Sequence, residues 1–327
     1  KSNDGTYDIN INDFFLNETQ AQLQLALFGL PKEFEKKTNL KIRDAFSNLN
    51  FKYGLEYSQD LLNNLKDSYG PLAEAMKNRQ NENLSKSEML GNAIIFTFAG
   101  HDTTAHTLTW LIYELSKNQY YQELLHKEII DFWKSHKNKS IKYNDFKRLP
   151  FMTRCIMETL RLWPTLVNGT FREIMFDDYI IGKDNNKVLV PKGTYVQIPN
   201  WSRHRSSKLW GDDVHIFNPF RDFKDDEIWD NEVIASYNPN SERFSPFTYG
   251  PRDCIGKNFA QIEMRIILLH LLDKYTFTLA KVQKNINEEN IMFNSFTMGP
   301  RDPNNIEMND NTLGLYVNIK KRVKSKL

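Results

Sequence analysis

The residues best suited to chemistry lie in one loop, Phe247–Gly256, with the sequence FTYGPRDCIG. Cys254 stands between two glycines, Gly250 and Gly256, and an apolar pattern with helical spacing follows directly. Glycine lets the backbone turn and approach a flat ligand closely. The amides that open the next helix would point at the sulfur and favour its anionic form, which can be an axial ligand of haem iron. The alternative is a buried structural cysteine after an ordinary turn.

Composition indicates a globular protein and does not point to nucleic acid. The chain has 327 residues, a net charge of +2 and 26% charged residues, which suits one large domain or two. Its two cysteines, Cys155 and Cys254, exclude a disulfide framework, and nothing else suggests a single bridge. No apolar run reaches the ~18 residues that span a bilayer, and no signal peptide or zinc pattern is visible.

One long helix is expected to run through the middle of the molecule. No proline interrupts the chain from Glu88 to about Lys117, and Ser85 or Ser87 can cap this segment. A helix of ~32 residues would be ~48 Å long. Because it is apolar on most faces, we expect it to be central. Gly100, beside three polar residues, predicts a local widening or kink.

The rest of the chain divides into helices, a β-rich part and irregular segments. Residues 1–20 are polar and predict a loop or frayed start, and helical patterns begin at Ala21. Residues 32–68 predict amphipathic helices, and 201–246 a long irregular segment of the kind that is usually functional. Further helices are expected over 71–79, 120–134, 151–162 and 255–273, and strands over 179–181, 188–190, 195–198 and 313–317.

Four motifs, taken together, resemble the cytochrome P450 family. The loop matches the family's haem-binding signature F-x-x-G-x-R-x-C-x-G at every fixed position. Ala99–Thr104 (AGHDTT) resembles the dioxygen-binding stretch of the family's long central helix. Glu158-x-x-Arg161 resembles its E-x-x-R motif, and Phe217–Arg221 the segment that adds a second arginine.

The resemblance covers about residues 20–320 and is closest to the eukaryotic microsomal fatty-acid ω-hydroxylase branch. It implies a mainly α fold with small β-sheets and a long central helix over the haem. Residues 1–327 would form a single domain lacking its N-terminal part, the C-terminal two-thirds only, because the central helix begins about 85 residues into this chain and several times further into relatives. The membrane anchor, the first helices and a helix that covers one haem face are then expected to be absent.

The resemblance implies haem b as cofactor, bound without covalent links apart from the bond between the Cys254 thiolate and iron. Ala99 stands where some ω-hydroxylases carry a glutamate esterified to the haem, so no ester is expected. Arg252 is the first candidate to bind a haem propionate and Arg172 the second, at a spacing from Pro164 one residue longer than in relatives. The expected cofactor-binding residues are Cys254, which is also the metal ligand, Arg252, Phe247, Gly250, Gly256, Gly100 and Arg172.

The same resemblance gives Asp102 and Thr103 catalytic roles. Both lie within one turn of Gly100, and if that turn faces the iron, the glycine makes room for dioxygen. Thr103 would then hydrogen-bond the bound oxygen, and Asp102 would relay protons to it. The alternative is a helix whose polar stripe contacts an internal water.

Other residues are expected to have structural or docking roles. Glu158 and Arg161 would form an exposed helix pair or, with Arg221, a buried network beneath the haem. His204 is predicted to lie at the surface and Cys155 in the core. The cations expected on the thiolate side, where they could attract an acidic redox partner, are Arg252, Lys257 and Arg265.

The function that follows is a haem-thiolate monooxygenase that inserts one oxygen atom of dioxygen into an apolar substrate, a lipid or sterol. It would take electrons from an NADPH-dependent flavoprotein reductase or a ferredoxin. The alternatives are a haem-thiolate isomerase or dehydratase, or a truncated remnant that holds no haem. An N-terminal anchor in the missing part would place the whole protein at the endoplasmic reticulum membrane.

Overall fold

The computed structural model is mainly helical, with four small antiparallel sheets among the residues that it describes. This confirms the predicted fold class. The amphipathic helices predicted within 32–68 lie outside the described residues. The structure describes residues 6–29, 70–80, 85–136, 140–182, 184–224, 227, 241, 243–248, 250–284, 292–294, 297–304 and 313–323.

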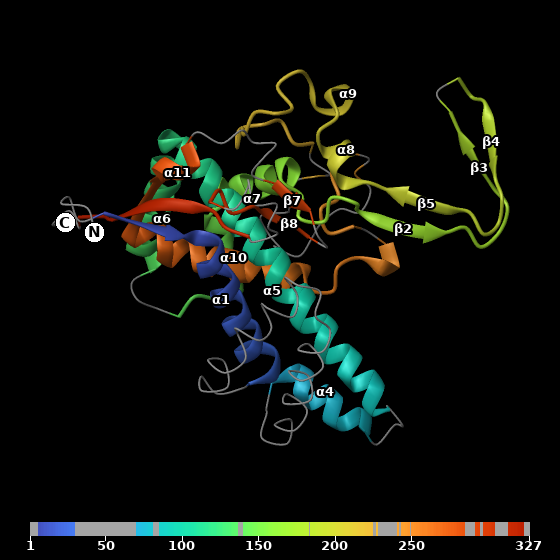
Figure 1. Cartoon of the computed structure of the whole chain (residues 1–327), viewed down its shortest axis with the longest axis horizontal. Coiled ribbons are helices and arrows are strands. Elements are labelled where there is room, and N and C mark those ends of the chain that lie inside the picture. Colours follow the sequence, from blue (N-terminus) through green and yellow to red (C-terminus); the bar gives the residue numbers. More distant parts are fainter. Residues whose placement is uncertain are drawn as a thin grey trace.

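The central helix is α5, Lys86–Lys117, which runs without interruption beside α1, Ile11–Leu23 (Figure 1). A capping box starts it: the Glu88 amide donates to Ser85 Oγ at 3.2 Å, and the Ser85 amide donates to a Glu88 carboxylate oxygen at 2.8 Å. The helix continues through Gly100 as an α-helix, and the local widening or kink expected there stays a prediction. A Cβ there would lie 2.7 Å from Leu23 Cδ1, so the glycine lets the two helices approach closely.

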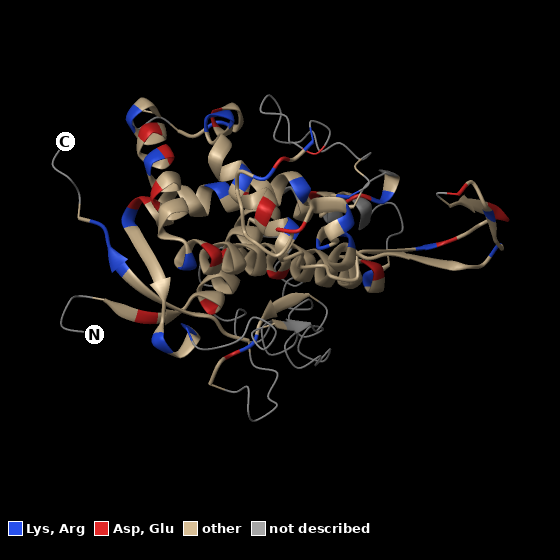
Figure 2. Cartoon of the chain, turned by 90° about the horizontal axis from the view of Figure 1, so that it is seen from above, with Lys and Arg blue, Asp and Glu red and all other residues tan. Residues whose placement is uncertain are grey.

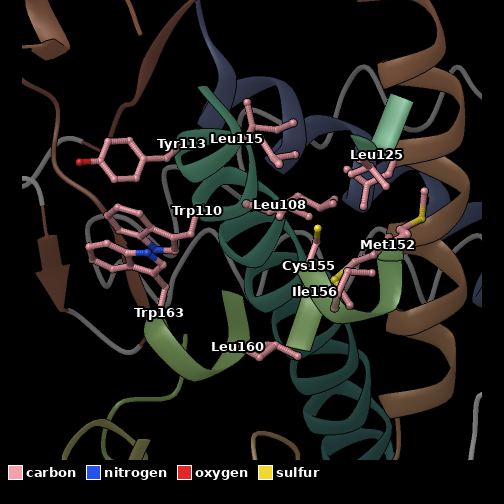
Figure 3. Close-up of a cluster of buried hydrophobic side chains, with 14 of the residues drawn as sticks. Leu108, Trp110, Tyr113, Leu115, Leu125, Met152, Cys155, Ile156, Leu160 and Trp163 are labelled. Carbon is pink, nitrogen blue, oxygen red and sulfur yellow. The ribbon is translucent and has the colours of Figure 1, made fainter. Parts of the chain in front are cut away.

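Three further helices pack around α5 and enclose the core: α6 (Gln119–His136), α7 (Pro150–Leu162) and α10 (Lys257–Lys274). Their bounds match the predicted helices to within two residues. Figure 3 shows leucine, tryptophan and methionine side chains of this cluster meeting between α5 and α7. The rings of Trp110 and Trp163 stack with centroids 4.3 Å apart. Cys155 belongs to the same cluster and is fully buried, as expected of a small hydrophobic residue.

The first described residues are structured, so the prediction of a loop over 1–20 is wrong. Strand β1, Tyr7–Asn10, pairs with β9, Tyr316–Lys321, which also pairs with β6, Tyr275–Leu279. Asn10 then caps α1 by accepting a hydrogen bond from the Asp13 amide at 3.4 Å. The buried face of α1 recurs every four residues, at Ile11, Phe15, Thr19 and Leu23, and the polar Thr19 in this series obscured that period.

A two-stranded ribbon, β2 (Thr170–Glu173) with β5 (Tyr195–Ile198), extends from the helical part and ends in a second hairpin, β3 (Asp178–Ile181) with β4 (Lys187–Val190) (Figures 1 and 2). Figure 2 also shows charges of both signs interspersed over the elements. None of the helices in the described part of the chain is long and apolar enough to cross a membrane. The shorter elements are η1 (Gln24–Phe28), α4 (Pro71–Gln80), η3 (Tyr143–Arg148), α8 (Asn200–His204), α9 (Ser207–Trp210), η4 (Gly250–Arg252), α11 (Lys281–Lys284), β7 (Met292–Asn294) and β8 (Met298–Pro300).

Candidate haem site

A cavity of about 560 Å³ separates α5 from the cysteine loop. It brings together five of the predicted site residues: Gly100 and Thr103 from the helix, and Phe247, Cys254 and Gly256 from the loop. The remaining wall is mostly apolar. It comprises Leu23, Leu27, Leu72, Ala75, Ile95, Phe96, Ala99, Thr104, Thr107, Leu160, Thr165, Leu166, Pro246, Thr248, Ile255, Phe259, Ala260 and Met264. A volume of this size suits a cofactor or a drug-sized ligand.

Cys254 is accessible from this cavity and makes no disulfide. The Cys254 amide donates to the Phe247 carbonyl at 3.0 Å, which closes the loop, and Thr248 adopts a left-handed φ of 55°. Burial raises the pKa of the Cys254 thiol, and the amides of Gly256 and Lys257 oppose that shift by donating to the sulfur. The start of α10 therefore presents amides to the sulfur as the sequence predicted, and a metal ion bound there would displace the thiol proton.

Thr103 faces the same cavity from α5. Its hydroxyl donates to the Ala99 carbonyl one turn earlier, at 2.9 Å, and Thr107 makes the equivalent bond to Thr103 at 2.8 Å. These bonds keep the hydroxyl at the helix surface, next to Gly100. The arrangement places a polar hydrogen-bonding group on a mostly apolar wall that it shares with Cys254.

Asp102 is not part of the cavity wall. Its carboxylate accepts a hydrogen bond from the Thr297 hydroxyl, and His106 Nδ1 lies 3.6 Å from Asp102 Oδ2 and 3.1 Å from Thr297 Oγ1. Burial lowers the pKa of His106, although the Asp102 charge opposes the shift. The sequence reasoning missed Thr297 and His106; the second could have been found from its position one helical turn after Asp102.

The predicted propionate cations, Arg252 and Arg172, do not line this cavity. Arg252 is exposed in the turn η4, which also contains Gly250. Arg172 instead lines a second, smaller cavity of about 130 Å³. Thr248 lies in the walls of both cavities, so the two adjoin at the cysteine loop.

The Glu158 cluster has the predicted composition and is buried. Arg161 donates to both carboxylate oxygens of Glu158, at 2.7 and 2.8 Å, and Arg221 donates to one of them at 3.0 Å. Arg161 also donates to the carbonyls of His204 and Val214 at 2.9 and 2.8 Å. The cluster therefore fastens α7 to the irregular segment and is a structural network, not an exposed helix pair.

Two predictions about charged residues are wrong. His204 is fully buried, where its Nε2 accepts the Ser245 amide at 3.3 Å, so it is not a surface residue. Arg265 is also buried: it donates to Thr153 Oγ1 at 2.8 Å, and burial lowers its pKa to about 10. Arg265 therefore cannot contribute to a docking surface, and Lys257 already pairs with Asp253 at 2.7 Å.

Comparison with known proteins assigns the chain to a family. The family model described as Cytochrome P450 matches residues 8–304. The chain belongs to the cytochrome P450 family. Members of this family bind haem b through a cysteine thiolate, and Cys254 occupies the cysteine position of the family signature.

The similar curated P450 proteins include one named as an ω-hydroxylase. The chain is 35% identical over 192 residues to human cytochrome P450 4F2 and 32% identical over 195 residues to human cytochrome P450 4F8. It is 32% identical over 192 residues to mouse leukotriene-B4 omega-hydroxylase 3. Each match covers 59% of this chain and 34% of the relative, so the match spans about a third of the relatives' length. These relatives support the ω-hydroxylase branch of the P450 family.

The residues around the larger cavity fit a haem. An accessible thiol receives two amide hydrogen bonds on one wall, a glycine lies on the opposite helix, and the walls between them are mostly apolar. Ala99 lies in this wall, and its methyl side chain cannot form an ester with the haem. The adjoining smaller cavity contributes an arginine, a suitable partner for a carboxylate of the haem.

Proposed function

We propose that the protein is a haem-thiolate monooxygenase acting on an apolar, lipid-like substrate. The observation that carries the proposal is the accessible thiol of Cys254 and the hydroxyl of Thr103 on the walls of one mostly apolar cavity. The name of the mouse relative, a leukotriene-B4 omega-hydroxylase, supports a long-chain lipid and oxidation at its far end. Electrons would come from an NADPH-dependent flavoprotein reductase or a ferredoxin.

When bound, the haem supplies the activation of dioxygen and the transfer of one oxygen atom to the substrate, while the other leaves as water. The chain's own residues prepare the site. Cys254 presents its sulfur toward the cavity, and the Gly256 and Lys257 amides stabilise negative charge on it. Gly100 leaves α5 without a side chain at the cavity, and Thr103 holds a proton at Oγ1.

The apolar wall binds and orients the substrate in this proposal. Leu23, Ile95 and Phe96 supply hydrocarbon surface in the same cavity as Thr103, which favours an alkyl chain over a polar ligand and excludes water. Asp102 is one residue from Thr103, and Thr297 and His106 hold its carboxylate. Asp102 does not line the cavity, so we propose that it supplies protons indirectly, through its neighbour Thr103.

Replacing Cys254 by alanine tests the ligand assignment. We expect the parent protein to bind one haem and, when reduced under carbon monoxide, to show the absorbance band of thiolate-ligated haem. The Cys254→Ala variant should lose that band completely. Cys155→Ala is the matched control, because Cys155 is buried in the core away from the cavity, and it should keep the band.

Retention of the band by the Cys254→Ala variant would refute the assignment. Absence of haem binding by the parent would favour the alternative that the protein is a truncated remnant, which folds but holds no haem. Incorporation of labelled oxygen from dioxygen into the product separates a monooxygenase from a haem-thiolate isomerase or dehydratase, which consumes none.

Replacing Thr103 by alanine tests its role in proton handling. Without the hydroxyl, electrons are expected to be lost to peroxide, with product per NADPH falling by about a hundredfold, the lower end of the effect of a positioned proton donor. Thr103→Ser keeps the hydroxyl and should keep most of the coupling. Unchanged coupling in Thr103→Ala would mean that the hydroxyl only satisfies the Ala99 carbonyl.

A further inference from the structure

The smaller cavity, of about 130 Å³, has the chemistry of an anion site. Two arginines from different elements line it: Arg172 from strand β2 and Arg203 from helix α8. Guanidinium groups favour planar carboxylates, to which they donate two parallel hydrogen bonds. The rest of the wall is polar apart from Ile198, and comprises Thr170, Ile198, Asn200, Ser245 and Thr248.

Arg203 is held in place by neighbours in the same wall. Its Nη2 donates to Asn200 Oδ1 at 3.0 Å and to the Ser245 hydroxyl, both of which are neutral oxygens. The positive charge of Arg203 also lowers the pKa of the adjacent His204, after the larger effect of burial. Arg203 is therefore a positioned cation, and its charge acts on a buried neighbour, His204.

The position of the two arginines relative to the cysteine loop is fixed by the backbone. The Ser245 amide donates to His204 Nε2 at 3.3 Å, which ties α8 to the residues that lead into the loop. Gly169 has a φ of 63°, and a Cβ there would lie 1.9 Å from the Ile198 carbonyl oxygen. This glycine lets β2 approach β5 and brings Arg172 into the same wall as Arg203.

We propose that Arg203, together with Arg172, binds a carboxylate of the haem in this smaller cavity. The proposal rests on the proposed function, because it requires haem in the adjoining cavity. Haem b carries two propionates at one edge, and Thr248 lines both cavities, so the smaller cavity lies next to the larger one. Arg172 was indicated by the family resemblance, whereas Arg203 is identified only by the structure, in which it lines the same cavity as Arg172.

The test compares two forms of the ligand. The apoprotein is titrated with haem and with haem dimethyl ester, in which both propionates are blocked, and affinities are read from the Soret absorbance. We expect Arg203→Gln to bind haem ~10- to 100-fold more weakly, the range for hydrogen bonds to a charged group, and to release it faster to apomyoglobin. The same variant should bind the ester almost as well as the parent does.

Lys208→Gln is the matched control, since it removes one exposed positive charge from the next helix, α9, and should change neither affinity. Arg203→Lys keeps the charge without the planar fork and should give an intermediate loss for haem. If circular dichroism shows that Arg203→Gln does not fold, the haem and ester affinities of Arg203→Lys test the proposal instead.

Two results would overturn the proposal while leaving the proposed function intact. The first is a folded Arg203→Gln variant that binds haem as the parent does or loses haem and ester equally. The second is a combination of two findings: the parent binds haem and its ester with equal affinity, and calorimetry shows that inorganic phosphate binds the apoprotein. The smaller cavity would then be a site for a free anion. A parent that binds neither form of haem would overturn both proposals.

Discussion

Replacing Glu158 by alanine is expected to lower the free energy of unfolding by about 3–5 kcal/mol. Its carboxylate accepts hydrogen bonds from Arg161, from Arg221 at 3.0 Å and from the Asn218 amide at 3.0 Å, and its side chain is fully buried. Alanine would leave two arginines buried without the charge that they share. The loss should appear in urea unfolding followed by tryptophan fluorescence, since Arg161 lies over the Trp210 ring at 5.4 Å.

Glu123→Ala is the matched control for this experiment. Glu123 also pairs with an arginine, Arg322, at 2.9 Å, but 55% of its side chain is exposed. An exposed pair of this kind contributes about 0–1 kcal/mol. A loss for Glu158→Ala no larger than that for Glu123→Ala would show that the buried cluster is not what fastens α7 to the irregular segment.

Replacing Glu263 by glutamine is expected to change how stability depends on pH. Burial raises the pKa of Glu263 to about 9, with a smaller contribution from Glu18, and neither carboxyl oxygen has a hydrogen-bond partner in the described part of the protein. The folded protein therefore keeps a proton that the unfolded chain releases above about pH 4.5. Because the folded state binds more protons between these values, the free energy of unfolding falls as pH rises through that window.

Glutamine cannot ionise, so this contribution disappears in the variant. The stability of Glu263→Gln relative to the parent should grow by about 1.4 kcal/mol per pH unit between pH 5 and pH 8. Urea unfolding at several pH values measures it. Glu18→Gln serves as the comparison, because Glu18 contributes less than burial does and should change the slope less. Parallel pH curves for Glu263→Gln and the parent would mean that Glu263 is ionised in the folded protein.

The parts of the site that follow from neighbouring residues could be predicted from the sequence. The loop around Cys254 is one such part, because glycines, a cysteine and the start of a helix within ten residues determine where the amides point. The Glu158–Arg161 pair is another, since a spacing of three residues on a helix fixes their contact. Helix α5 could also be predicted, because a capping serine and a long stretch without proline are both visible in the sequence.

Features that depend on distant partners could not be predicted. The orientation of Asp102 is set by Thr297, 195 residues later, and the burial of His204 by Ser245, 41 residues later. The first helix was missed for the same reason, because its apolar face is defined by α5 and by the strand that closes the sheet. Arg203 gave no signal in the sequence, since only the fold brings α8 beside β2.

The pairing of β1 with β9 has a consequence for synthesis of the chain. Asp8 and Asn318, joined by a side-chain hydrogen bond of 3.0 Å, are 310 residues apart, so this sheet forms only after the end of β9 has left the ribosome. The Ile11 amide at the start of α1 donates to Leu315 at 2.8 Å and is anchored at the same late stage. Because Leu23 of α1 lines the larger cavity, that wall is completed last, and contacts of such high sequence separation form slowly. Completion of that wall therefore waits for the synthesis of β9.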